Sequence, residues 1–174
     1  MIAEFSRPVR LDTLGTAPRR VEIAADESER AALARRFSLL ALDRLDAWAE
    51  LTREGEAVIA VGALRASATQ ACVASGDPVP AEVAEDFALR FIPESDEAPA
   101  DEVELGETDL DEIFYAGSSI DLGEAAAQTF ALALDPFPRA IGADEALRAA
   151  GVLGEGDVGP FAALKGLKSK LGDG

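Results

Sequence analysis

The fold is decided by residues 45–91, which read LDAWAELTREGEAVIAVGALRASATQACVASGDPVPAEVAEDFALRF. Apolar and polar residues alternate at the beginning and at the end of this stretch, and a period of two is typical of strands that bury one face. Turn residues at Glu54-Gly55 and Gly76-Asp77-Pro78 separate the apolar runs. The pattern therefore predicts consecutive strands with short turns, which form an antiparallel meander that is packed on one face and wet on the other.

Strands are expected on both sides of this stretch as well as within it. The alternation is clearest over 79–91, where only Glu85 interrupts the apolar face. A turn at Gly15 and Pro18 separates two short strands near the N-terminus. In chain order, the predicted strands cover residues 6–11, 20–24, 45–52, 57–64, 66–74, 79–91 and 110–115.

Helices complete the predicted fold. The first two begin with an Asp that is followed three residues later by a Glu, which is the spacing of a capping box. The charged side chains of the first helix that we expect to face water are Glu29, Arg30, Arg35 and Arg36. The predicted helices cover residues 26–37, 122–134 and 144–150 and the segment after Pro160. The fold class is therefore α+β, with a curved antiparallel sheet, as an open meander or in a barrel-like form, and helices mainly in the C-terminal third.

The chain is acidic, and its charge is unevenly distributed. Its 174 residues, which suit one domain over 1–174, hold 33 Asp and Glu against 16 Lys and Arg, a formal net charge of -17. This charge argues against a large phosphate-binding surface, because a nucleic acid backbone would repel the protein. Residues 1–65 nevertheless contain 10 Arg, whereas residues 82–112 contain 13 acids and one Arg. We interpret residues 93–109 as a flexible acidic loop, which attracts a basic partner, mimics nucleic acid or only aids solubility.

The composition excludes several kinds of catalytic and metal site. The chain has no His, which removes Ser-His, Cys-His and His-ligated metal chemistry. Cys72 is the one cysteine, so neither a disulfide nor a thiolate zinc site can form within the chain. We expect Cys72 to lie within a strand as a small buried side chain, with no His, Lys or helix start nearby to lower its pKa. Phosphate-binding and calcium-binding loops are also missing, and we therefore expect no enzyme activity, no cofactor and no metal.

No membrane association is expected either. The first ten residues, MIAEFSRPVR, lack the basic-then-apolar pattern of a signal peptide. The longest apolar runs fall far below the roughly 20 residues of a membrane span. A cytoplasmic location follows by default.

Four segments carry a resemblance to a known family. They are ARRFSLLALDRLDA (34–47), ATQACVASGDPVPAEVAEDFALRF (68–91), SIDLGEAAAQTFALALDPFPRA (119–140) and FAALKGLK (161–168). The most telling pieces are the Cys followed by an acidic strand, and the Ile-Asp-Leu helix start with its Leu-Asp-Pro stop. Together and in this order, the segments are similar to the YceD family, whose members are called large ribosomal RNA subunit accumulation proteins. The resemblance spans most of the chain and leaves the acidic stretch as the variable part.

The resemblance implies a bacterial, non-enzymatic factor that supports the accumulation or processing of large-subunit ribosomal RNA. Many members of the family carry a Cys-x-x-Cys pair in the central strand, where this chain has Cys72 and Ser75. Some members have further cysteines near the end of the long helix, where this chain has Arg139 and Ala140. The resemblance therefore implies that a metal or redox role built on such cysteines is not available to this chain.

The distribution of charge suggests how such a factor would bind. We hypothesise that the acidic half holds a basic ribosomal protein or an assembly factor, through Glu94, Asp96, Glu97, Asp101, Glu102 and Glu104. Alternatively, the arginine-rich first third contacts ribosomal RNA directly, through Arg19, Arg20, Arg35 and Arg36. The lysines of the chain either complement the dipole of a final helix or add a small contact for RNA phosphate; they are Lys165, Lys168 and Lys170. A carboxylate-dependent enzyme is the least favoured interpretation.

Overall fold

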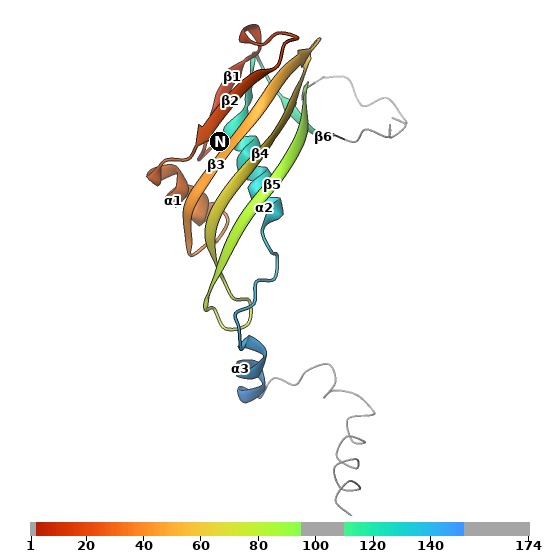
Figure 1. Ribbon diagram of the computed structural model, residues 1–174. Coiled ribbons are helices and arrows are strands. Elements are labelled where there is room, and N and C mark those ends of the chain that lie inside the picture. The colour runs from red at the N-terminus through yellow and green to blue at the C-terminus, as the bar shows by residue number, and fades with distance from the viewer. Residues whose placement is uncertain (1–2, 95–109, 152–174) are drawn as a thin grey trace, which may run out of the picture. The chain divides into compact units, whose positions relative to one another are not determined.

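The computed structural model describes residues 3–94 and 110–151 of the chain (Figure 1). The helix expected after Pro160 and most of the acidic stretch at 93–109 lie outside the described residues. In chain order, the elements are β1 (Pro8–Arg10), a short 3-10 helix (Leu11–Thr13), β2 (Arg19–Ala24), α1 (Glu27–Arg36), β3 (Ala41–Glu54), β4 (Ala57–Ala71), β5 (Pro78–Pro93), β6 (Asp111–Tyr115), β7 (Ser119–Asp121), α2 (Leu122–Ala133) and α3 (Ala143–Ala149).

A five-stranded sheet forms the centre of the fold, with the strand order β2-β3-β4-β5-β6. β2 and β4 both pair with β3 in the antiparallel direction. β6 instead runs parallel to β5, and the number of residues between the two strands exceeds the dozen or so that a parallel connection needs. In the part of the chain that the structure describes, β2 and β6 do not pair with each other, so the sheet is open and not a barrel. The predicted α+β class with a mainly antiparallel sheet is confirmed.

Two predicted strands merge into one. The sequence predicts a break near Arg65, between strands at 57–64 and 66–74, whereas β4 runs through this position without interruption. Arg65 is exposed and lies in register with Asp46 of β3, so the alternation of the two faces continues past it. The strand expected at 6–11 is shorter and pairs with β7 in a separate two-stranded sheet.

One face of the large sheet packs against α2 and against the residues that precede β1. The largest side chains in this core include Phe5, Phe91 and Phe130, all of which are buried. The helix turns small residues toward the core, namely Gly123, Ala125, Ala126 and Ala127. A Cβ atom on Gly123 would lie 2.6 Å from the backbone oxygen of Phe5, so a glycine is needed for the N-terminal segment to pass this close to α2.

The predicted helix starts are confirmed. The Asp26 carboxylate accepts a hydrogen bond from the N–H of Glu29, whose side chain accepts one from the N–H of Asp26, and this completes a capping box on α1. Asp121 caps α2 by accepting a hydrogen bond from the N–H of Glu124. α3 corresponds to the short helix expected over 144–150. Of the helices in the described residues, none is long and apolar enough to cross a membrane.

The opposite face of the large sheet has no helix over it within residues 3–94 and 110–136 (Figure 1). Trp48 lies on this face, in register with Glu22 of β2 and Ala63 of β4. The guanidinium of Arg20 stacks 4.1 Å from the centre of the Trp48 ring, which covers much of the indole. The solvent-facing side of the sheet that the alternation predicts is therefore present, and Trp48 lies on it.

The chain forms two compact units, and each is described by itself. The first contains the five-stranded sheet, α1 and α2. Of the described residues, the second contains Ala71–Val79 and 137–151, with α3 among them. Within the second unit, the N–H of Cys72 donates to the carbonyl oxygen of Asp77 at 2.8 Å and closes the turn between β4 and β5.

Candidate functional site

Acidic side chains gather on β5, on β6 and at the end of β5. Arg90 is the one basic residue on these two strands, and it lies in register with Glu112. No arginine in the described residues forms an ion pair with any carboxylate of this group. We call this group the acidic edge, and it consists of Glu82, Glu85, Asp86, Glu94, Asp111 and Glu112.

The acidic edge overlaps the predicted acidic site at one residue. Glu94 follows β5 directly, and its N–H donates to the carbonyl oxygen of Tyr115 at 2.9 Å. The other residues predicted for the site lie outside the described part of the chain: Asp96, Glu97, Asp101, Glu102 and Glu104. The site prediction left out the carboxylates on the strands themselves. A signal for them was present in Glu85, which interrupts the apolar alternation of β5 and is exposed although its neighbours on that face, Val83 and Phe87, are buried.

An open groove runs beside the acidic edge. One wall is a continuous stretch of β5, Glu85–Leu89, together with Asp111 at the start of β6. The other wall comes from the last turns of α2, where Leu132 is 85% exposed. The groove thus combines carboxylates with exposed apolar surface, which is the chemistry that accommodates a side chain with an apolar stem and a cationic head.

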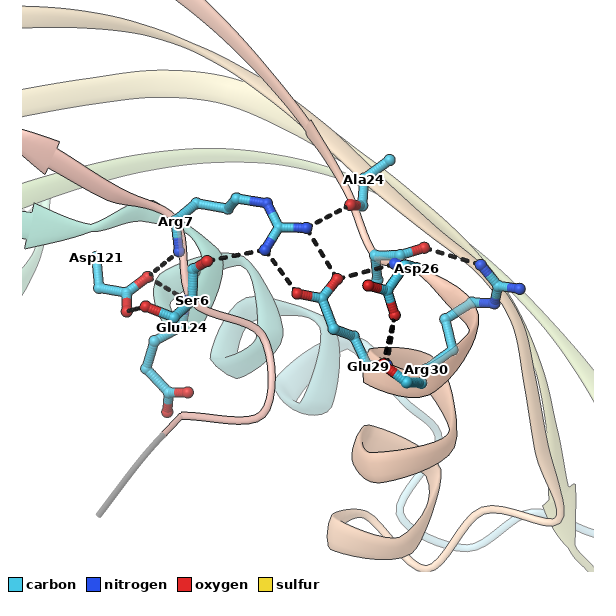
Figure 2. A network of polar contacts seen from close by, with 10 residues as sticks. Ser6, Arg7, Ala24, Asp26, Glu29, Arg30, Asp121 and Glu124 are labelled. Atoms are coloured by element: carbon cyan, nitrogen blue, oxygen red, sulfur yellow. Dashed lines mark hydrogen bonds and ion pairs between the residues drawn. The ribbon is translucent and has the colours of Figure 1, made fainter.

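Several arginines of the first third have acidic partners inside the protein. Figure 2 shows the Arg7 guanidinium between α1 and β2, where it donates to the two carboxylate oxygens of Glu29 at 2.6 and 2.8 Å and to the carbonyl oxygen of Ala24 at 2.9 Å. This hydrogen-bonded pair lowers the pKa of Glu29 and raises the pKa of Arg7. The prediction that Glu29 simply faces water is wrong, because its side chain is only 16% exposed and is held by an arginine from another segment.

Arg36 is held in a similar way. Its guanidinium donates to both carboxylate oxygens of Glu124 on α2, at 2.7 and 2.8 Å, and to Glu4 at 3.0 Å. The Arg36 hydrogen bonds lower the pKa of Glu124. Arg36 is exposed, as predicted, and its charge also links the N-terminal segment, α1 and α2.

The four arginines of the alternative RNA site do not form one patch. Arg19 lies opposite Leu51 of β3, whereas Arg35 lines a groove that contains Leu42 near the other end of β3. The interval from Leu42 to Leu51 corresponds to roughly 30 Å along an extended strand. Arg20 is paired with Glu22 at 3.0 Å. Of the four, Arg19 and Arg35 are exposed and form no ion pair in the described residues, and these two lie near opposite ends of β3.

Cys72 lies directly after β4 and not within a strand. Its side chain is 3% exposed, so the expected burial is confirmed. The backbone N–H of Ala140 and the hydroxyl of Ser75 lower the pKa of the thiol from its ordinary value to about 7. The expectation that nothing lowers this pKa is wrong, because Ala140 is distant in the sequence. Among the described residues, no cluster of three or more carboxylates and thiols could hold a metal ion.

Comparisons with known proteins point to one family. A family model described as "Large ribosomal RNA subunit accumulation protein YceD" matches residues 60–168. This match covers more than half of the chain, and it includes β5, β6 and α2, which build the acidic edge and its groove. No curated protein sequence and no solved structure matches the chain significantly.

Proposed function

This chain belongs to the YceD family of large ribosomal RNA subunit accumulation proteins, and from that premise we propose that it is a non-catalytic factor in the biogenesis of the large ribosomal subunit. The family name supports a role in the accumulation of the ribosomal RNA of that subunit. The charges of the protein support a mechanism in which it binds a basic ribosomal protein or an assembly factor.

The observation that carries this mechanism is the acidic edge. None of its six carboxylates forms an ion pair with an arginine of the described residues, although Glu82 interacts with Arg44 and accepts a hydrogen bond from Ser67. Most of this negative charge therefore remains available to a partner of opposite sign. Complementary charges across an interface raise association rates and weaken as salt is added. The same negative field would keep the bound basic protein away from non-specific contact with RNA.

Direct binding of RNA by the arginine-rich first third receives less support. Arg20 and Arg36 are engaged by carboxylates of the protein itself, and Arg19 donates to the hydroxyl of Thr13 at 2.9 Å. A phosphate would have to displace these partners before it gained a contact. Arg19 and Arg35 have no ion pair in the described residues, and two arginines near opposite ends of β3 are a small electrostatic footprint for RNA.

The first experiment measures the ratio of large-subunit to small-subunit ribosomal RNA in cells depleted of this protein. We expect the ratio to fall, to recover when the protein is expressed again, and to recover poorly with a variant that reverses charges on the acidic edge. An unchanged ratio after depletion would contradict the proposed function. The charge-reversed variant carries Glu85→Lys, Asp86→Lys and Glu112→Lys.

A matched control separates the acidic edge from net charge. Three exposed carboxylates elsewhere in the first unit also lack arginine partners among the described residues, and their reversal changes the net charge by the same amount: Glu27→Lys, Glu54→Lys and Glu56→Lys. We expect the control to restore the ratio. A pull-down from RNase-treated lysate should then recover a basic protein with the wild type and with the control, and not with the acidic-edge variant.

A further inference from the structure

Much of β5 is an unpaired sheet edge. β5 has 16 residues, and β6 pairs only with Leu89–Pro93. Within residues 3–94 and 110–151, no strand lies beside Pro80–Ala88 on the side away from β4. A strand edge of this kind offers a row of free N–H and C=O groups that another extended chain can pair with.

The backbone groups that face this edge can be identified. The N–H of Glu94 donates to the carbonyl oxygen of Tyr115, the last residue of β6. The backbone N–H and C=O of Glu94 therefore point to the β6 side of β5. Successive residues of a strand direct these groups to opposite sides. Counting back in steps of two, the residues that present both groups to the free edge are Glu82, Ala84, Asp86 and Ala88. The backbone N–H and C=O groups of the residues between them point toward β4.

The groove lies beside the same free edge. Its floor and walls contain Glu85, Phe87 and Asp111, with the exposed Leu132 of α2 opposite. An added strand would place alternate side chains over this groove. Carboxylates on both sides of an apolar wall favour lysine or arginine side chains, whose stems pack on Leu132 while their heads meet the acids.

We propose that an extended basic segment of a protein partner adds to the sheet as a strand along Pro80–Ala88 of β5. The basic class of the partner rests on the proposed function, and the strand pairing rests on the free edge. A second copy of this chain fits the edge poorly, because it would bring Glu85 and Asp111 of one copy toward equivalent carboxylates of another. RNA fits poorly as well, since it has no peptide groups to complete the ladder.

The test uses the full chain and a fluorescent synthetic peptide of alternating lysine and valine residues. Ala84→Pro removes an N–H that faces the free edge and leaves the pairing with β4 in place, because proline is tolerated where the missing donor points to solvent. Ala84→Thr keeps the N–H and is the matched control. We expect Ala84→Pro to weaken peptide binding by about tenfold or more, as a lost hydrogen bond with an unsatisfied acceptor would do, and Ala84→Thr to bind as the wild type does.

A second peptide tests the backbone of the ligand. N-methylation of alternate residues removes one row of donors without changing charge, and we expect it to abolish binding. Amide hydrogen exchange on the full chain should slow at Ala84, Asp86 and Ala88 when the unmethylated peptide binds. The amides of Glu85 and Phe87, which point toward β4, should not change and serve as the internal control.

The outcomes distinguish this proposal from the proposed function. Equal binding of both peptides, or of the wild type and Ala84→Pro, would overturn strand addition while leaving a charge-driven role of the acidic edge intact. Self-association that Ala84→Pro removes, seen by sedimentation, would assign the edge to a second copy and also overturn the proposal. An unchanged ribosomal RNA ratio in depleted cells would instead defeat the proposed function, whatever the peptide does.

Discussion

Two charged regions of this protein differ in how their charges are used. Two arginines of the N-terminal third are tied to carboxylates on other segments, Arg7 to Glu29 and Arg36 to Glu124. The carboxylates of the acidic edge, by contrast, form no ion pair with an arginine within the described residues. The first region uses charge to hold segments together, and the second leaves it for a partner.

The comparison shows why counts of charged residues mislead. The first 65 residues contain 10 Arg, which favours an RNA-binding surface on composition alone. A guanidinium that donates to a carboxylate on a neighbouring element has little net charge left to attract phosphate. Three-dimensional pairing therefore weakens the case for RNA binding that the count of arginines alone would make, and variants can test each side of it.

The largest effect is expected from Arg7→Met. This change leaves the half-buried carboxylate of Glu29 without its bidentate partner and removes the bond to the carbonyl of Ala24. We expect a loss of about 2 kcal/mol in the free energy of unfolding, measured by urea titration at pH 7. Arg35→Met, in an exposed arginine of the same region without an ion pair in the described residues, should cost within about 0.5 kcal/mol. Equal losses for the two variants would contradict the structural role of the pair.

A smaller effect is expected from acid. The folded-state pKa values of Glu29 and Glu124 lie below the ordinary value of 4.5. The stability that they contribute is thus present above pH 4.5 and is lost as the pH falls through the folded pKa. Their arginine partners have raised pKa values and stay charged throughout this range.

The Arg7→Met variant shows how much of this pH dependence comes from the pair of Arg7 and Glu29. Without Arg7, the pKa of Glu29 should return toward its ordinary value. The variant should therefore lose less stability than the wild type between pH 7 and pH 3. Urea titrations of both proteins at the two pH values measure the difference, and parallel losses would show that the pair does not stabilise the fold.

Sequence reasoning succeeds where the information is local. The alternation in β3 and β5 and the Asp-x-x-Glu starts of α1 and α2 predict those elements, because strand faces and helix caps depend on residues a few positions apart. The parallel direction of β6 depends on a long connection, and the pattern of its residues does not encode it.

The same limit applies to the sites. Arg7 and Glu29 are 22 positions apart, and the N–H that helps to lower the pKa of Cys72 comes from Ala140. The groove beside β5 needs Leu132 from α2, which no local pattern connects to Glu85. Sequence reasoning therefore identified the acidic character of this part of the chain, but it could not predict which residues of β5, β6 and α2 form one surface.

The smallest effect on stability is expected from the acidic edge. Glu85→Gln, Asp86→Asn and Glu112→Gln together remove three charges that have no arginine partner among the described residues, so unfolding at pH 7 should change by no more than about 0.5 kcal/mol. Glu29→Gln, the same chemical change inside a bidentate pair, should cost more than all three combined. The triple variant should nevertheless lose most of its binding to the basic peptide, together with most of the salt dependence of that binding. If the triple variant unfolds as easily as Glu29→Gln does, the carboxylates of the acidic edge support the fold, and the division between the two regions fails.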